Sequence, residues 1–457
     1  MSTPLFPDLP GDSEPIAGPK PVTGGGAPRL RQPQREQAEM RVASLDQLLP
    51  PDHPVRAVWA FVVGLDLTPL LQRIQAVAGH AGRNANDPRV LLALWLQATL
   101  DGVGSARVLD EFCRVHLAYE WLCGGVSMNY HSLADFRTAH VEVLDRLLTD
   151  SVGVLLHEGL VQLQRVAQDG MKVRASAGAS SFRREPTLKA CLEQAESQVA
   201  ALKAQADETP TTASARQQAA RERAARERAE RLQQALAQRE QLIVLRTQQQ
   251  KEKGVKFEAA QLRVSTTDPE ARKMHMPDGG TRPAFNLQLA TTTQSGIIVG
   301  VAVTNSGSDS GQLEPMLEQL EKRYEQRPGE MLLDGGFASL KDIEAAETTA
   351  SPTKVYAPIK DEAKKQANGQ DPYQPRRGDG PGVTQWRQRM GAAEAKSIYR
   401  ERASTAEWAN AALRRRGVRQ WSVRGLRGVL AVALLHALAH NLRRAATLRQ
   451  EAANPKA

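Results

Sequence analysis

The sequence predicts an α/β fold with a helical N-terminal part and an inserted helical hairpin, and three patterns carry this prediction. Between residues 58 and 148, apolar residues recur at three- and four-residue steps, which is typical of packed helices. Residues 186–253 shift abruptly to Ala, Gln, Arg and Glu with a heptad seam. Beyond residue 285, β-branched stretches alternate with helical segments, which favours strands that pack against helices.

The charge distribution favours an acidic partner. The chain has 457 residues, with 60 Lys and Arg against 51 Asp and Glu and a net charge of +9. Eleven arginines lie between residues 400 and 449 beside only two Glu, so this segment alone accounts for the excess. A localised Arg-rich segment indicates a phosphate-binding face, with a solvated Arg-rich helix as the alternative. Nucleic acid is therefore the first candidate partner.

Three further features predict a cytoplasmic protein. No apolar run approaches the ~20 residues that span a bilayer. The chain opens without a basic start followed by an apolar stretch, so we expect no secretory signal. Three cysteines in 457 residues predict no disulfide framework, which fits a reducing compartment.

Residues 1–39 are predicted to form a disordered leader and residues 40–160 a helical domain. The first 28 residues hold seven Pro and five Gly, too few apolar groups for a core. Asp87 and Pro88 predict the start of a buried helix that ends near Gly102, and further helices are expected over 106–115 and 132–148. Ser132 and Asp135 have capping-box spacing. Short helices with tight turns fit either a helix-turn-helix unit that binds DNA or an all-helical packing domain.

Residues 186–253 are predicted to form a helical arm. Apolar residues at alternating steps of four and three run from Leu188 to Ala206 and resume from Ala225 to Ile243, on either side of the turn ETPTT. Two helices joined by a short turn should pack as an antiparallel hairpin, here a coiled coil, projecting roughly 60 Å at ~1.5 Å per residue. The arm has no candidate catalytic residues, so we expect it to serve in dimerisation or DNA contact.

The remaining segments predict the sheet and its covering helices. Strands are expected over 161–178, over the hairpin formed by 285–293 and 296–305, over 330–338, where the strand closes in a Gly-rich turn, and over 354–359. Helices are expected over 309–324, 340–347, 404–416 and 423–446. Residues 360–395 are rich in polar residues, Gly and Pro and predict a loop, and residues 448–457 predict a tail.

Three carboxylates are the candidate catalytic groups. Asp169 and Asp334 are each predicted at the end of a strand, directly before Gly, and Glu407 lies on a helix within the Arg-rich segment. A flexible turn after a strand leaves room for a cation and an incoming phosphate. Converging carboxylates suit Mg²⁺, and two such ions promote displacement at phosphorus. Taken singly each acid is more often a cap or a surface ion pair, and Asp268 and Asp309 compete for the same role, Asp309 with a plausible helix cap.

Several separated motifs together resemble a known family. The segments QDGMKVRASAG, LLDGGFAS and YRERASTAEWANAALRRRG, followed by RGLRGVLAVALLHALAHNLRR, resemble the catalytic core of bacterial insertion-sequence DDE transposases. The stretch DPRVLLALWLQATLDGVGSARVLDEFC with NYHSLADFR resembles the InsH-type N-terminal domain of the same group. The motifs occur in the expected order over about residues 40–447.

This resemblance implies a ribonuclease-H-like mixed-sheet catalytic domain over 161–185 and 254–447, with 186–253 inserted. It implies that Asp169, Asp334 and Glu407 are the DDE triad and bind two Mg²⁺ ions, with Mn²⁺ as a plausible substitute. The family's Tyr, Arg, Glu and Lys signature maps to Tyr399, Arg402, Glu407 and Arg414. Two departures stand out: four residues separate Arg402 from Glu407 where three are commonest, and Arg replaces Lys. Arg still binds phosphate, in a bidentate manner.

Other residues near the motifs have two interpretations each. Lys172 follows Asp169 closely and either contacts backbone phosphate or is an ordinary exposed strand charge. Trp408 either stacks on a displaced base or is a buried helix residue. Four Cys and His side chains have spacings that match no familiar zinc pattern, so a core role is favoured for the cysteines: Cys113, His116, Cys123 and His131.

The functional hypothesis is a transposase, with two competitors. It would bind the terminal repeats of its insertion sequence through residues 40–160, hydrolyse phosphodiester bonds with divalent metal and transfer the strand to target DNA. Its partners would be double-stranded DNA at the element ends and target, and a second copy of the chain in a homodimer, in the bacterial cytoplasm and nucleoid. The competitors are a metal-dependent nuclease of the same fold and a non-catalytic DNA-binding protein derived from a transposase.

Overall fold

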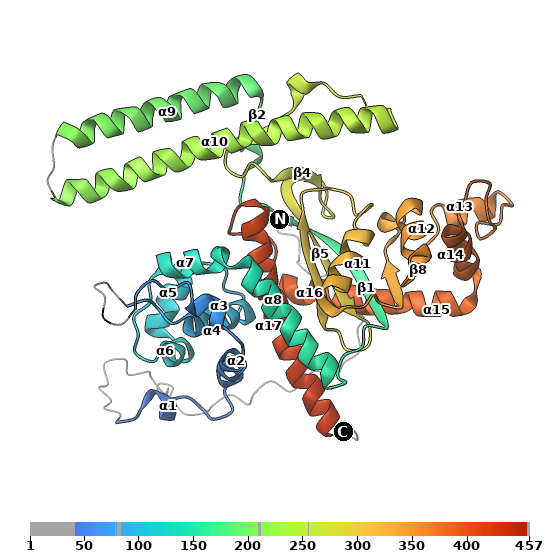
Figure 1. Cartoon of the computed structure of the whole chain (residues 1–457), viewed down its shortest axis with the longest axis horizontal. Helices are drawn as coiled ribbons and strands as arrows, with labels where there is room; N and C mark the ends of the chain where they lie inside the picture. The colour runs from blue at the N-terminus through green and yellow to red at the C-terminus, as the bar shows by residue number, and fades with distance from the viewer. Residues whose placement is uncertain (1–41, 78, 80–83, 209–211, 255, 455–457) are drawn as a thin grey trace, which may run out of the picture. The chain divides into compact units, whose positions relative to one another are not determined.

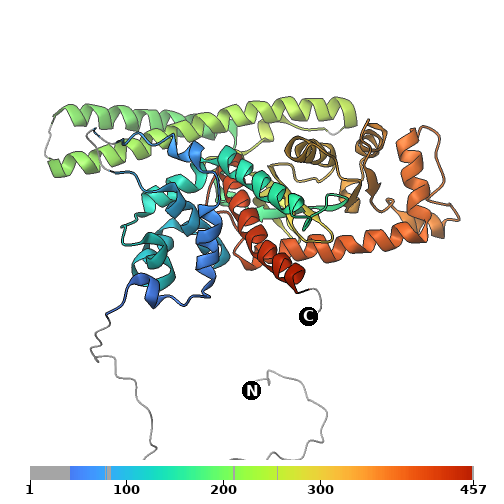
Figure 2. The ribbon, with the colours of Figure 1, turned by 60° about the horizontal axis from the view of Figure 1, so that its bottom comes forward.

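The computed structural model describes residues 42–77, 79, 84–208, 212–254 and 256–454, and the predicted leader and the very end of the tail fall outside these residues. The chain separates into residues 1–44 and residues 45–457. The elements described below belong to the second unit, which Figures 1 and 2 show from two directions.

Within the described residues, eight helices precede the first strand, so the helical character that the apolar periodicity predicted is confirmed. Their bounds are α1 (Leu45–Leu48), α2 (Pro54–Val63), α3 (Thr68–Leu71), α4 (Pro88–Leu100), α5 (Ala106–Val115), α6 (Leu117–Cys123), α7 (Tyr130–Ala139) and α8 (Val141–His157). The predicted start of α4 is confirmed, since the Asp87 carboxylate accepts a hydrogen bond from the Arg89 N–H at 2.8 Å. α4 is buried on nearly all sides, because Leu92, Leu94 and Leu96 are all fully covered.

The single helix predicted over 132–148 is wrong. The chain breaks at His140, which has φ −120° and ψ 41°, so that α7 and α8 are separate helices. The cap is Asn129 rather than Ser132, because the Asn129 side chain accepts from the Ser132 N–H at 2.9 Å. Neither Gly nor Pro marks the break at His140, which is why the sequence pattern concealed it.

A mixed six-stranded sheet forms the centre of the second unit. The strands are β1 (Arg165–Arg174), β4 (Arg272–His275), β5 (Thr281–Thr292), β6 (Ile298–Thr304), β7 (Glu330–Leu333) and β8 (Lys354–Tyr356), in the order β4-β5-β1-β7-β8 with β6 also paired to β5. β5 is antiparallel to β1, β4 and β6, whereas β1, β7 and β8 are parallel to one another. The predicted hairpin of β5 and β6 is confirmed, and β1 lies at the junction of the antiparallel and parallel halves.

The helical hairpin is inserted in the chain between β1 and β4. α9 (Glu185–Glu208) and α10 (Thr212–Lys253) lie side by side, as Figure 1 shows, and pack through Leu188 and Ala195 against Ala229 and Leu232. The 42 residues of α10 extend about 63 Å at the ~1.5 Å rise of an α-helix. At the base of the hairpin stand the short antiparallel strands β2 (Phe182–Arg183) and β3 (Val264–Ser265) and the 3₁₀ turns Ala179–Ser181 and Ala259–Gln261.

Helices cover the sheet and continue to the C-terminus. They are α11 (Leu313–Tyr324), α12 (Leu340–Thr348), α13 (Glu362–Ala367), α14 (Pro381–Gly391), α15 (Ala393–Arg402), α16 (Trp408–Arg415) and α17 (Gly425–Ala453), with a 3₁₀ turn at Gly335–Phe337 and a π-helical turn at Ala403–Glu407. The loop predicted over 360–395 is wrong, because α13, α14 and the first three residues of α15 lie there. α14 forms because Val383, Trp386 and Met390 share one face and are buried.

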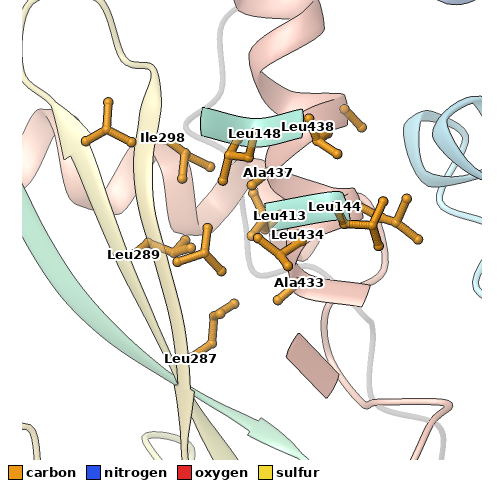
Figure 3. Close-up of a cluster of buried hydrophobic side chains, with 14 of the residues drawn as sticks. Leu144, Leu148, Leu287, Leu289, Ile298, Leu413, Ala433, Leu434, Ala437 and Leu438 are labelled. Carbon is orange, nitrogen blue, oxygen red and sulfur yellow. The ribbon is translucent and has the colours of Figure 1, made fainter. Parts of the chain in front are cut away.

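α17 joins the helical part to the sheet. It packs on α4, α7, α8 and β6, and Figure 3 shows Leu434 and Leu438 of α17 among Leu144 of α8 and Leu289 of β5. Asn441 bonds the edge of β6 twice, accepting from the Ile298 N–H at 2.8 Å and donating to its carbonyl at 2.7 Å. α17 continues to Ala453, well into the segment predicted as a tail.

α17 is also the one helix of the described residues that is long and apolar enough to cross a membrane, by length and composition alone. Of its most apolar window, 61% is buried inside the protein, as expected for the core helix of a folded domain.

Candidate active site

Strand register brings two of the three candidate carboxylates together. β1 and β7 are parallel, and their last paired residues are Gln168 and Leu333. Asp169 and Asp334 are therefore the next residues on neighbouring strands, which lie about 4.8 Å apart in a sheet. The expectation that Asp169 ends its strand is wrong, since β1 continues to Arg174 along β5. Asp169 instead marks the point where β7 ends and only the antiparallel partner continues.

The Asp169 carboxylate is held by three donors. Arg402 donates from Nη2 to Oδ1 at 3.0 Å, Asn410 donates from Nδ2 to Oδ2 at 2.7 Å, and the Gly170 N–H also reaches Oδ1 at 3.0 Å. The two side chains of the ion pair are 12% and 19% exposed for Arg402 and Asp169, so the pair is largely screened from water. The orientation of the Asp169 carboxylate is therefore fixed, because each of its two oxygens accepts a hydrogen bond from a side chain.

Burial raises the pKa of Asp169 above its ordinary value of 3.8. Arg402 and the Gly170 N–H lower this pKa, whereas the nearby carboxylates of Asp334 and Asp309 raise it. Burial is also the largest cause of a raised pKa of Tyr399, to which the carboxylates of Asp334 and Asp169 contribute. The site thus gathers carboxylates around the largely buried Asp169, with Asp334 exposed, and a cation would relieve their repulsion.

A helical segment with a π turn carries the groups that hold Asp169. Arg402 ends α15, the π turn spans Ala403–Glu407, and Asn410 lies in the first turn of α16. Arg402 and Asn410 are eight residues apart, and in a regular α-helix such residues point about 80° away from each other. The wider π turn between them reduces this angle, so that both side chains reach the same carboxylate. The turn also coincides with the extra residue between Arg402 and Glu407. An i→i+5 turn brings the fifth residue to the place that the fourth has in an α-helix.

Asp309 does not have the role of helix cap that the sequence suggested. α11 begins after Gln312, without a side-chain cap. The Asp309 Oδ1 atom instead accepts from Asn286 Nδ2 and Gln288 Nε2, both at 2.7 Å, from buried side chains of β5. A Cβ on Gly170 would stand 2.1 Å from this oxygen, so the glycine is what allows Asp309 to approach β1.

Glu407 stands apart from the other acids in this structure. Its side chain is exposed, and it makes no hydrogen bond or ion pair with any residue of the described ranges. Within those ranges, no three His, Cys, Asp or Glu side chains are grouped so as to hold a metal ion. Mg²⁺ is commonly held by one or two carboxylates together with water and substrate phosphate. Asp169 and Asp334 fit that smaller donor set.

The residues proposed to contact phosphate occupy different environments. Tyr399 and Lys172 are half-buried, and Lys172 pairs with Asn286 in the strand register. Arg414 is exposed, with its Nε 3.2 Å from the Met171 sulfur, beside the face of β1 that carries Asp169. Tyr399 and Arg402 are thus close to the acid pair, and Arg414 lies one turn beyond Asn410.

Two further candidates have structural roles. Asp268 lies at the N-terminus of α17, where its Oδ1 accepts from the Gly425 N–H at 3.2 Å, while Glu270 accepts from the Leu426 N–H at 2.8 Å. Trp408 is 41% exposed and packs edge-on against His440, with ring centroids 5.0 Å apart, so the expectation of a buried Trp is wrong. Cys123 is buried and Cys113 half-buried, both as free thiols.

Two comparisons with known families agree with this geometry. The transposase DDE domain family matches residues 245–442, and a transposase domain family (DUF772) matches residues 43–139. Together the matches cover more than half of the chain. The chain belongs to the DDE transposases. No curated protein and no solved structure matches it significantly.

The DDE match includes Asp334 and Glu407 but begins after Asp169 and after most of the arm. The pairing of β1 with β7 is therefore the observation that links Asp169 to the matched part of this transposase. Sequence reasoning missed Asn410, which is a polar residue in an otherwise small and apolar helix face, two turns beyond Arg402. That placement was the only available signal.

Proposed function

We propose that this transposase binds the terminal repeats of its insertion sequence, hydrolyses phosphodiester bonds with divalent metal and transfers the resulting strand to target DNA. The observation that carries the proposal is the neighbouring position of Asp169 and Asp334 at the end of β7, with Arg402 and Asn410 fixing the Asp169 carboxylate. The family match supports the reaction class.

A ribonuclease-H-like core is part of the proposal. The sheet order β6-β5-β1-β7-β8, with an antiparallel half around β5 and a parallel half from β1 to β8, supports it. In such a core, carboxylates at the middle of the sheet face the substrate at the point where the two halves meet. The domain limits proposed are 161–185 and 254–447 for this core, with the arm of 186–253 inserted.

We assign different roles to the acids and to Arg402. Asp169 and Asp334 would hold Mg²⁺, or Mn²⁺ in its place, and Glu407 would join them once DNA is bound. Two bound ions supply a Lewis acid for the phosphate and stabilise the attacking and leaving oxygens. Arg402 keeps Asp169 oriented through one N–H and has further N–H groups for a phosphate oxygen. The raised pKa of Asp169 means that cation binding must also displace a proton as the pH falls.

The bond changes follow from hydrolysis and transfer. In the first step the oxygen of water bonds to phosphorus, the P–O3′ bond breaks, and the leaving oxygen takes a proton to become a 3′-hydroxyl. In the second step that 3′-hydroxyl loses its proton, its oxygen bonds to a phosphorus of the target, and the target's own 3′ oxygen leaves and takes up a proton. Tyr399, Arg402, Arg414 and Lys172 would contact the phosphates during both steps.

DNA recognition and assembly complete the proposal. The helices of residues 40–160 would bind the element ends, and a homodimer would hold two ends at once. The protein would act in the bacterial cytoplasm, on the nucleoid. α9 and α10 offer a long exposed surface for a second copy of the chain or for DNA.

The test is Asp334→Asn on DNA that carries the element ends. We expect this variant to bind the DNA as wild type does and to lose cleavage, because it removes one carboxylate of the neighbouring pair. Full cleavage by Asp334→Asn would overturn the proposal. Cleavage by wild type without joined products would favour the nuclease, and wild type that binds without cleaving would favour the non-catalytic DNA-binding protein.

A further inference from the structure

A cavity lies between α16 and α17, on the side of α16 away from Asp169. Its volume is about 480 Å³. One wall is formed by α16 and the residue that follows it, through Trp408, Ala412, Arg415 and Arg416. The other wall is formed by α17, through residues that include His440, Arg443 and Arg444. Each set follows helical spacing, so one face of each helix forms one wall. We call this the arginine cavity, defined by Arg415, Arg416, Arg443 and Arg444.

Three of the four arginines that define the cavity have no acidic partner among the described residues. No Asp or Glu is among its lining residues. Arg444 donates to the Ser295 carbonyl at 2.7 Å and reaches Glu451 at 3.3 Å. Arg415, Arg416 and Arg443 make no ion pair with any residue that the structure describes. Unpaired guanidinium groups held close together favour an anionic ligand.

Arg416 distinguishes the cavity from an ordinary solvated surface. Its Nη1 atom is buried and has no hydrogen-bond partner. Burial lowers the pKa of Arg416, and the nearby Arg443 and Arg415 lower it further. A buried donor left without an acceptor costs free energy, which an oxygen-rich ligand would recover.

We propose that the arginine cavity binds a backbone phosphate of DNA, at a place distinct from Tyr399, Arg402 and Arg414. The proposal rests on the proposed action of the chain on DNA. The face of α16 that holds Asp169 through Asn410 lies back to back with the face that lines the cavity. A strand that passes the exposed Glu407 side of this helix therefore reaches the arginines within about one helix diameter, roughly 10 Å. The cavity would anchor DNA beside the reacting phosphate.

The test measures DNA binding in EDTA, without any cleavage. The probe is a fluorescent DNA duplex of unrelated sequence, titrated with protein at a series of salt concentrations. The variants are Arg443→Gln and the double variant Arg415→Gln with Arg443→Gln. The control is Arg419→Gln, which removes the same charge from an exposed position outside the cavity.

Each lost phosphate contact should reduce the slope of log K against log salt by about 0.9, which is about an eightfold loss of affinity at 0.1 M salt. We expect this reduction of the slope for Arg443→Gln and a reduction at least as large for the double variant. Arg419→Gln should keep the wild-type slope. Because Arg443 is exposed, its variant is expected to fold, which circular dichroism checks. A wild-type slope in both cavity variants would overturn the proposal.

A second experiment distinguishes binding of DNA from binding of free phosphate. Inorganic phosphate alone is added to wild type and to the double variant, and thermal unfolding is followed, since a ligand of the native state raises the midpoint. A rise in wild type only, with unchanged DNA slopes, would identify a free-phosphate site and overturn the DNA assignment. Wild type that fails to bind any duplex would instead contradict the proposed function itself.

Discussion

Asp268 provides a quantitative test of how the structure positions its acids. The carboxyl is fully buried, one oxygen accepts from the Gly425 N–H at the start of α17, and the other has no partner. Burial raises its pKa from 3.8 to about 6. The perturbation is Asp268→Asn, which keeps the shape and an acceptor for Gly425 while removing the ionisation.

The sign follows from proton binding. A raised pKa means that the folded state holds its proton more tightly than the unfolded chain, so the stability from this group is present below pH 3.8 and is lost as the pH rises through about 6. A shift of about two units corresponds to about 3 kcal/mol, at about 1.4 kcal/mol per unit. The stability of Asp268→Asn relative to wild type should therefore rise by about 2.5 kcal/mol between pH 4 and pH 8, because a small part of the effect is already lost at pH 4.

The assay is urea unfolding followed by circular dichroism at several pH values for both proteins. The comparison across pH removes any constant cost of burying the Asn amide N–H groups, for which the structure shows no acceptor. Asp278→Asn is the control, because Asp278 is exposed and its pKa is lowered by Arg282. A difference between Asp268→Asn and wild type that stays constant from pH 4 to pH 8 would refute the reasoning.

Three further substitutions test the site and its support. Gly170→Ala places a Cβ 2.1 Å from the Asp309 Oδ1 atom and should destabilise the protein by about 1–3 kcal/mol in urea unfolding; a neutral result would mean that Asp309 does not hold this position. Asn410→Leu removes a hydrogen bond to the Asp169 carboxylate worth about 1.5–3 kcal/mol, so single-turnover nicking should fall about 10- to 150-fold with DNA binding retained, and unchanged nicking would remove Asn410 from the account. Trp386→Ala should cost about 3–5 kcal/mol of stability, whereas a loss below 1 kcal/mol would contradict the packing of α14.

Local signals in the sequence were sufficient for many elements. Asp87 and Pro88 predicted the start of α4 because a cap and a first-turn proline act within a few residues. The alternation of 285–305 predicted the β5 and β6 hairpin for the same reason. α14 was missed because Gly and Pro around it outweighed the helical spacing of Val383, Trp386 and Met390. Its stability comes from tertiary burial, which local propensity does not record.

The candidate site depended on longer-range features. The sequence singled out Asp169 and Asp334, but their neighbouring position follows from a register between strands more than 150 residues apart, which no local pattern specifies. The π turn that ends at Glu407 explains the motif's extra residue, and a turn of this kind has no sequence signal of its own. The exposure of Glu407 and the contact of Asn410 with Asp169 depend on how the helix lies on the sheet.

Exposed Glu407 is the part of the proposed triad that differs most from expectation. Asp169 and Asp334 are fixed by the sheet, whereas Glu407 lies in the π turn, which contacts β1 and β5. In the proposed function, DNA and cation binding would bring its carboxylate toward Asp169 and Asp334. Substitution of Glu407 therefore tests whether this exposed side chain takes part in the reaction.

The measurement that tests the central claim most directly is a cleavage and strand-transfer assay on DNA carrying the native element ends, with Mg²⁺ or with EDTA, for wild type and Glu407→Gln. The account predicts nicked ends and joined products only for wild type with Mg²⁺, and DNA binding by both proteins. Equal cleavage by Glu407→Gln, or cleavage by wild type in EDTA, would contradict it.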